Sequence, residues 1–279
     1  MSTSKQRPLA TDGVVRVFEY CCLSPKGTRP ETETFAWPAI SMVTHGVFGF
    51  RSSRSTQLLS TGSLLLADPG RSYEVSHEHA GHDTCLVFRF EQETFDRLAG
   101  SPKRSSGYFA RSVLPPLPRL DALRHLAQHR MKARAAPLGL EELGVSLATE
   151  VLSLAGTGTK AKDTPLENTD AIYAALAKLE TSYETDVTLL ELARVAGLSP
   201  FHFLRSFKRV VGVTPYRFLV RRRLRAAVEQ LADTNKAVTD IAYDVGFGDL
   251  SNFTNTFTRE VGCSPGKFRQ SVLGRRAFD

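Results

Sequence analysis

The strongest constraint on the fold is a pattern that the C-terminal part of the chain carries twice. Residues 192–215 read LARVAGLSPFHFLRSFKRVVGVTP, and residues 241–265 read IAYDVGFGDLSNFTNTFTREVGCSP. In each copy a short apolar helix is predicted to end at a glycine, because glycine readily adopts the left-handed conformation that a tight turn needs. Ser199 and Asp249 then stand at the N-cap of a second helix. The spacing predicts two helix-turn-helix units.

The second helix of each copy is predicted to have one apolar and one polar face. At about 100° per residue, Phe203 and Phe207 point inward in the first copy, as Phe253 and Phe257 do in the second. The opposite face presents side chains suited to readout in the DNA major groove, although each of them alone is equally an ordinary surface residue. The residues predicted to contact base edges are Phe201, His202, Leu204, Arg205, Ser251, Asn252 and Asn255.

Positive charge is concentrated in the same region. The chain has a net charge of +7, and residues 192–228 contain no acidic residue. A run of charge is often only a solvated helix face, but its overlap with the repeat favours a polyanion partner. A helix from Pro215 to about Ala232 would be roughly 27 Å long and would hold the two units about one DNA turn apart. The residues predicted to contact phosphates are Ser199, Lys208, Arg209, Arg221, Arg222, Arg223 and Arg259.

The segment from about Asn168 to Gln270 resembles the DNA-binding domain of the AraC/XylS family of bacterial transcription regulators. The motifs that carry the resemblance are Gly-Leu-Ser-Pro … Phe-Lys … Gly-Val-Thr-Pro and Ile-Ala-x-x-x-Gly-Phe … Phe … Gly-x-x-Pro. The resemblance implies a regulator whose helices Pro200–Val211 and Leu250–Val261 read adjacent major-groove segments of double-stranded promoter DNA, with RNA polymerase as a partner. Asn255 stands where the family often has arginine, so the second helix is expected to depend partly on the first for affinity.

Residues 13–90 show a different pattern, in which short alternating segments lie between turn residues. It favours an antiparallel barrel or sandwich with strands at 14–18, 40–44, 47–50, 63–66 and 85–90. Residues 62–73 resemble part of a cupin, the barrel that AraC/XylS members commonly use to bind an effector or to dimerise. A small-molecule effector is accordingly expected in a cavity lined by Trp37, His45, Phe48, Phe50 and Tyr73.

The predicted fold class is therefore α+β: an N-terminal cupin-like antiparallel β-barrel with a helical hairpin, then an all-α domain with two helix-turn-helix motifs. The predicted parts are a disordered N-terminus at 1–12, a sensing or dimerisation domain at 13–154 with helices from about 118, a linker at 155–166, and the DNA-binding domain at 167–279. The Gly/Thr/Lys-rich linker lacks the spacing of a phosphate-binding loop, which leaves a flexible tether as its interpretation.

Residues 140–154 carry an apolar stripe at spacings of three and four, formed by Leu140, Leu143, Leu147, Val151 and Leu154. Two interpretations remain open for this stripe. The helix packs against the barrel of its own chain, or it pairs with its copy in a homodimer.

No cofactor and no metal are expected. The segment from His77 to Asp83 contains weak metal candidates in His77, His79, His82 and, nearby, Cys85, but a polar hairpin with exposed histidines is the favoured interpretation. Tyr73 also stands where metal-binding cupins place a histidine. His125 with His129 as a chelating pair and Cys21-Cys22 as a redox switch are weaker hypotheses still.

The sequence does not indicate an enzyme, since it shows neither a nucleophile motif nor paired carboxylates at catalytic spacing. The alternatives to a transcription regulator are a cupin-type metalloprotein or enzyme with an appended helical domain, and a non-specific architectural protein. No stretch approaches the roughly 18 apolar residues of a membrane span, and residues 1–11 do not have the apolar segment of a secretory signal. The chain is therefore expected in the cytoplasm, without a membrane partner and with its four cysteines reduced.

Overall fold

The computed structural model describes residues 4–11, 13–23, 30–52, 55–77, 82–100, 107–118, 120, 123–125, 137–155 and 168–276. The chain forms two compact units. The first comprises Met1–Pro115, Arg130–Glu167 and Val210–Gly212, and the second comprises Pro116–His129, Asn168–Arg209 and Val213–Asp279. The first unit is built around antiparallel sheets and the second is helical, which confirms the predicted α+β class.

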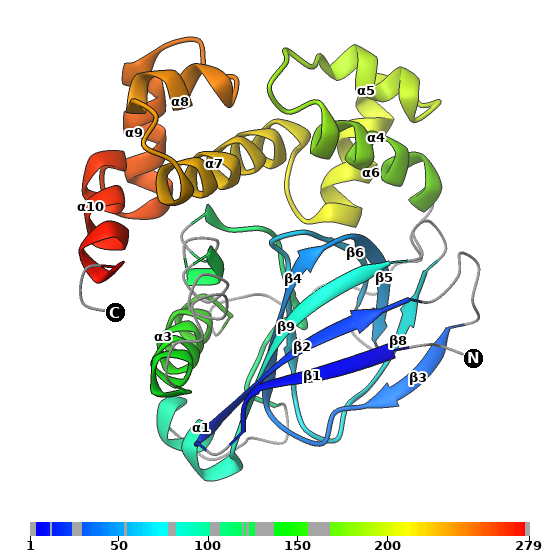
Figure 1. The fold of residues 1–279 in the computed structure, drawn as a ribbon. Coiled ribbons are helices and arrows are strands. Elements are labelled where there is room, and N and C mark those ends of the chain that lie inside the picture. The colour runs from blue at the N-terminus through cyan, green and yellow to red at the C-terminus, as the bar shows by residue number, and fades with distance from the viewer. Residues whose placement is uncertain are drawn as a thin grey trace. The chain divides into compact units, whose positions relative to one another are not determined.

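Two antiparallel sheets form the first unit (Figure 1). The larger sheet has the strand order β1 (Ser4–Ala10), β2 (Val15–Cys22), β9 (Asp83–Phe90), β4 (Ala39–His45), β7 (Leu64–Ala67), β10 (Val113–Leu114). The smaller sheet has the order β3 (Glu31–Thr34), β8 (Ser72–Ser76), β5 (Val47–Ser52), β6 (Ser55–Ser60). The five predicted strands are confirmed as parts of β2, β4, β5, β7 and β9.

The core of this unit lies between the two sheets. Phe48, Phe50 and Leu59 of the smaller sheet pack with Val43 and Leu65 of the larger one in one buried cluster. Alternation along β5 buries Phe48 and Phe50 and leaves Arg51 exposed, because successive side chains of a strand point to opposite faces.

The N-terminus differs from the prediction of disorder at residues 1–12. Residues 4–10 form the edge strand β1, which pairs with β2 from Ser4 opposite Cys22 to Ala10 opposite Val17. The side chains of β1 are mostly exposed and polar, so the composition of this segment is typical of a disordered terminus. The register shifts next to Pro8, and charged residues and proline are both typical of an edge strand.

Two helices pack in the first unit beside the larger sheet: α1 (Gln92–Leu98) and α3 (Pro137–Ala155). The apolar stripe of α3 faces the interior of this unit, since Leu140, Leu143, Leu147 and Val151 are buried. At Gly144 a Cβ would lie 2.6 Å from Val15 Cγ1, so α3 approaches β2 closely. This burial supports the first of the two interpretations, packing of the helix within its own chain, while a homodimer through residues 140–154 stays a prediction.

Within residues 168–276 the second unit contains seven helices: α4 (Thr169–Thr181), α5 (Leu189–Val195), α6 (Pro200–Val211), α7 (Pro215–Asp233), α8 (Val238–Asp244), α9 (Leu250–Val261) and α10 (Pro265–Arg276). Figure 1 shows α4, α5 and α6 at one end of α7 and α8, α9 and α10 at the other. Among the described residues, no helix combines the length and the apolar character that a membrane crossing requires.

The boundary between the two units differs from the predicted one. Residues 116–129 were expected in the barrel domain but belong to the helical unit. Residues 118, 120 and 123–125 are helical, and the Arg124 guanidinium lies 2.9 Å from Glu229 of α7. His125 lies 3.7 Å from Asp233 of the same helix. His129 and the predicted linker beyond residue 155 lie outside the described residues.

Candidate nucleic-acid interface and candidate cavity site

The turn of the first copy is built as its sequence predicts. Thr188 and Glu191 cap α5 reciprocally, since the Glu191 N–H donates to Thr188 Oγ1 at 3.2 Å and the Thr188 N–H donates to Glu191 Oε2 at 2.9 Å. These bonds to Thr188 hold the pKa of Glu191 below its usual value. Gly197 has a φ of 62°, and Leu198 N–H donates to Ala193 O at 2.9 Å. Ser199 Oγ accepts from His202 N–H at 3.4 Å and caps α6.

The second copy repeats this geometry. Gly246 has a φ of 92°, and Phe247 N–H donates to Ala242 O at 3.0 Å, which is the equivalent of the first bond. Asp249 caps α9 by accepting from Asn252 N–H at 2.7 Å. Both turns therefore need a left-handed residue at the same place, and glycine adopts that conformation without strain.

Helix α6 separates its buried and exposed residues as predicted. Phe203, Phe207 and Val210 are buried. Phe201 is 72% exposed and Leu204 is 38% exposed, which are large values for apolar side chains on a helix surface. The polar residues on the same surface are also exposed: His202, Arg205 and Lys208.

Helix α9 has the same division but a different chemistry. Phe253 and Phe257 are buried, whereas Ser251, Asn252 and Asn255 are exposed. Every residue predicted to contact a base edge is thus accessible on α6 or α9. Their contact with DNA remains a prediction.

The arginines of α7 are placed differently from the prediction. Arg222 Nε lies 2.9 Å from Glu180 Oε2, and its guanidinium lies 3.7 Å from the centre of the Tyr183 ring. Arg225 Nη2 contacts the same Glu180 oxygen at 2.5 Å. Arg223 donates to the carbonyls of Tyr183 at 2.7 Å and Thr185 at 2.9 Å. These bonds tie α7 to α4 and to the turn that follows it.

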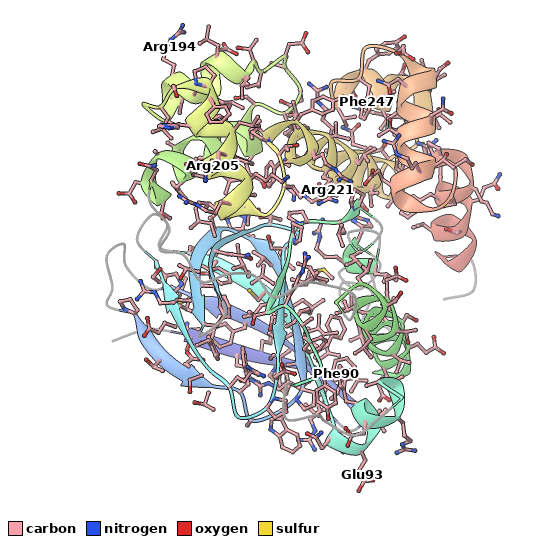
Figure 2. The ribbon with its side chains drawn as sticks, turned by 180° about the vertical axis from the view of Figure 1, so that it is seen from behind. Phe90, Glu93, Arg194, Arg205, Arg221 and Phe247 are labelled. Carbon is pink, nitrogen blue, oxygen red and sulfur yellow. The ribbon has the colours of Figure 1, made fainter. Side chains whose placement is uncertain are left out.

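These placements do not favour the predicted phosphate contacts of Arg221, Arg222 and Arg223, which stay a prediction. Arg221 is only 6% exposed, and the guanidinium groups of Arg222 and Arg223 are committed to partners within the unit. Figure 2 shows Arg194 projecting away from the helices, in contrast to Arg221 on α7. Of the predicted phosphate contacts, Ser199, Lys208 and Arg259 are exposed and Arg209 is half-buried.

The first unit contains a cavity of about 300 Å³ between its two sheets. Of the predicted lining residues, Trp37, Phe48 and Tyr73 do line it. Phe50 packs instead in the core between the sheets, and His45 is exposed at the end of β4, with its ring 5.5 Å from that of His82. The lining residues that the prediction missed include Tyr20, Cys22, Phe35, His77, Asp83 and Arg89.

Tyr73 is fixed in the cavity wall by two contacts. Its ring stacks on Phe35 with 4.0 Å between the centroids, and its hydroxyl donates to the carboxylate of Glu33. Burial and the bond to Glu33 both raise the pKa of Tyr73, so its phenol stays neutral. Tyr73 thus presents an aromatic face and no charge to a bound molecule.

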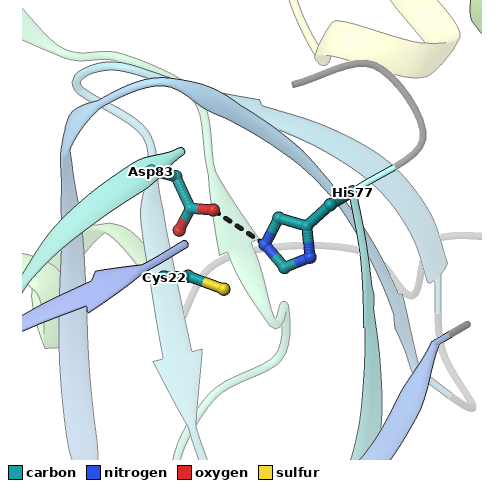
Figure 3. Close-up of side chains that lie close together, drawn as sticks. All are labelled: Cys22, His77 and Asp83. Atoms are coloured by element: carbon teal, nitrogen blue, oxygen red, sulfur yellow. Dashed lines mark hydrogen bonds and ion pairs between the residues drawn. The ribbon is translucent and has the colours of Figure 1, made fainter. Parts of the chain in front are cut away.

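Part of the cavity wall is a group of polar side chains, whose arrangement is drawn in Figure 3. Among the residues that the structure describes, Cys22, His77 and Asp83 form the one group of at least three metal-ligating types whose donor atoms all lie within 4.8 Å of one another. All three are buried, and His77 Nε2 lies 2.7 Å from Asp83 Oδ1. Strand pairing explains the proximity of two of them, since Cys22 of β2 lies opposite Asp83 of β9.

The weak metal candidates from the sequence are dispersed by the fold. His77 is in this group, but His82 is exposed and its Nε2 lies 3.4 Å from Cys21 Sγ. Cys85 lines the cavity outside the group, and burial raises the pKa of its thiol. His79 lies outside the described residues.

Comparison with known proteins gives matches to the helical region. A family model described as a helix-turn-helix domain matches residues 192–271. The transcriptional activator RhaS of Enterobacter sp. (strain 638) is 42% identical over 106 residues, which are 38% of this chain and 38% of RhaS. The bifunctional transcriptional activator and DNA repair enzyme AdaA of Bacillus subtilis (strain 168) is 35% identical over 92 residues, 33% of this chain and 44% of AdaA. The chain thus spans less than half the length of these relatives.

A solved structure matches the same region. It is the DNA-binding domain of the global transcriptional factor AdpA in complex with a target DNA, with a TM-score of 0.37 and 24% identity, covering 38% of this chain and 96% of that chain. The likeness of the helical region to known proteins therefore rests on the sequence matches and not on this solved structure.

Proposed function

We propose, from the premise that the C-terminal region is a helix-turn-helix domain of the AraC/XylS type, that the chain is a sequence-specific DNA-binding transcription regulator. The observation that carries the proposal is the repeated geometry of α5–α6 and α8–α9. Each pair buries two phenylalanines of its second helix, spaced four residues apart, and exposes the N-terminal part of that helix. Helices α6 and α9, at the two ends of α7, would then be two recognition helices held apart by one connecting helix.

The length of α7 supports simultaneous contact with two grooves. Its 19 residues span roughly 28 Å at 1.5 Å per residue. With the turns added, α6 and α9 would enter successive major grooves, which lie roughly 34 Å apart. In this arrangement Arg205 would read guanine, Asn252 or Asn255 would read adenine, and Phe201 would contact thymine methyl groups. Lys208 and Arg259 would contact phosphates.

The sheet unit is proposed to be a cupin-like sensing domain for a small organic molecule. Its cavity of about 300 Å³ is at the small end of the range for ligand pockets, and its wall combines aromatic side chains with a few polar groups. Occupancy would then alter DNA binding or contact with RNA polymerase. The second candidate, a metal-binding protein, is favoured by one specific observation, the group of Cys22, His77 and Asp83.

The test of DNA reading uses the full chain. Selection from a random duplex library should enrich one motif with two half-sites about one helical turn apart. Affinity for the selected duplex should exceed that for a scrambled duplex by roughly 10³-fold or more at physiological salt. Equal affinity for both duplexes would identify a non-specific architectural protein instead.

A further inference from the structure

We infer that Cys22, His77 and Asp83 bind one divalent transition-metal ion of the zinc class in the wall of the cavity between the sheets. Figure 3 shows the three side chains converging from different strands or their ends. The inference concerns the sheet unit alone and does not depend on the proposed DNA binding.

The donor atoms have nearly the spacing that such an ion needs. Bond lengths of about 2.0 Å to nitrogen and oxygen and about 2.3 Å to sulfur place tetrahedral ligand atoms roughly 3.3 to 3.8 Å apart. The thiol, imidazole and carboxylate atoms here lie within 4.8 Å of one another, with His77 Nε2 and Asp83 Oδ1 at 2.7 Å. Small rotations of side chains therefore suffice, and the strand pairing of Cys22 with Asp83 remains unchanged.

The simpler explanation of the group is an ion pair between His77 and Asp83. It accounts for two buried polar side chains that contact each other. The ion pair does not explain why the Cys22 thiol and a cavity also lie beside these two side chains. A metal site uses all three donors and the neighbouring space.

The donor types select the ion. One thiolate, one imidazole and one carboxylate suit zinc and similar ions such as cobalt(II), whereas calcium and magnesium need mostly oxygen ligands. Three protein ligands leave one position of a tetrahedron open. Because the group lines the cavity, that position would take water or a donor atom of a small molecule held there.

Binding would follow a balanced exchange of protons. Cys22 would lose its thiol proton to solvent and bind as a thiolate. His77 Nε2 would give up the proton that it donates to Asp83, to solvent or to Nδ1, and would bind the ion with one proton left on Nδ1, and Asp83 would bind as a carboxylate. The hydrogen bond between His77 and Asp83 would be replaced by bonds from both residues to the ion.

The experiment titrates cobalt(II) into the full chain after removal of metals with a chelator under reducing conditions. Wild-type protein should bind one equivalent and develop a thiolate-to-cobalt charge-transfer absorption, which zinc(II) then abolishes by displacement. Cys22→Ser should remove this absorption. His77→Ala and Asp83→Asn should each weaken binding by at least about 100-fold, since loss of even an outer-shell partner changes metal affinity 10–100-fold.

Cys21→Ser is the matched control, because Cys21 directly precedes Cys22 in β2 and is not one of the three proposed metal ligands. It should keep the absorption and the affinity of the wild type. Circular dichroism checks the fold of each variant, and X-ray absorption at the zinc edge of the wild-type protein, which needs no variant, should report one sulfur ligand. The inference is overturned if the wild type shows no charge-transfer band, if Cys22→Ser retains it, if Cys21→Ser loses it, or if the zinc has no sulfur ligand.

Discussion

The two helix pairs of the second unit have the same interior and different surfaces. Phe203 and Phe207 lie with 5.5 Å between ring centroids at 56°, and Phe253 and Phe257 lie at 5.6 Å and 52°. Each pair continues to a phenylalanine of the next helix: Phe207 to Phe218 at 6.1 Å and Phe257 to Phe268 at 6.0 Å. The exposed faces instead differ, with an arginine and apolar groups on α6 and serine and asparagines on α9. The buried phenylalanines and the exposed side chains thus lie on different sides of the same helix, so one set can vary while the other is kept.

The turns differ in a second way. A Cβ at Gly197 would meet no atom within 4 Å, whereas at Gly246 it would lie 2.6 Å from Glu184 O and 2.9 Å from the Arg223 guanidinium. The first turn is open and the second is packed against the segment after α4. The same glycine is therefore required by backbone conformation alone in one copy, and by conformation and space in the other.

The largest expected effect tests the shared interior. Phe207→Ala and Phe257→Ala should each lower the free energy of unfolding by about 3–5 kcal/mol, because each leaves a cavity beside two other rings. Urea unfolding followed by circular dichroism measures both. Losses that differ by more than about 2 kcal/mol would show that the two interiors are not equivalent in energy.

The glycine turns come next in size. Gly197→Ala should cost roughly 1–2 kcal/mol from its left-handed conformation alone. Gly246→Ala should cost about 2–4 kcal/mol, because the clash with Glu184 and Arg223 adds to that strain. The same unfolding measurement applies, and equal costs would contradict the packing of the second turn.

The exposed faces are compared by DNA affinity. On the selected duplex, Arg205→Ala should cost about 1–3 kcal/mol of binding free energy and relax the preference at one base pair. Asn255→Ala should act in the same way at a position in the other half-site, with an effect toward the lower end of that range. Fluorescence anisotropy with single-substituted duplexes measures both. Loss of preference at the same base pair in both variants would contradict two separate reading helices.

The smallest expected effect, on the salt dependence of DNA binding, distinguishes an exposed basic side chain from one that is paired within the helical unit. Lys208→Ala should weaken binding to all duplexes about equally and reduce the slope of log affinity against log salt by about 1. Arg222→Ala should leave that slope unchanged and lower stability by about 1–3 kcal/mol, since it removes a partner of Glu180. A salt titration of both variants checks this, and a reduced slope for Arg222→Ala would restore it as a phosphate contact.

Local patterns predicted much of this molecule. The repeated glycine, cap and phenylalanine positions specify α5, α6, α8 and α9, because each signal acts within one or two helical turns. The alternation of apolar and polar residues predicted five strands, because this signal also acts between near neighbours in the sequence. Strand β1 was missed, because its stability comes from pairing with β2 rather than from apolar residues of its own.

The errors concern partners that are distant in sequence. The charge run on α7 could not be separated from a phosphate-binding face, because the partners of Arg222 and Arg223 come from Glu180 and from backbone carbonyls of another segment. The group of Cys22, His77 and Asp83 depends on the register between β2 and β9, which pairs two residues that are 61 positions apart in the sequence. No periodicity in one segment reports such a contact.

The packing of Arg124 beside Glu229 has a practical consequence for dissecting the chain. A fragment that begins after residue 155 would omit the residues of the 116–129 stretch that contribute to the helical unit, and would uncover part of α7. The helical unit is therefore discontinuous in the sequence, and a fragment cut at residue 155 lacks part of it.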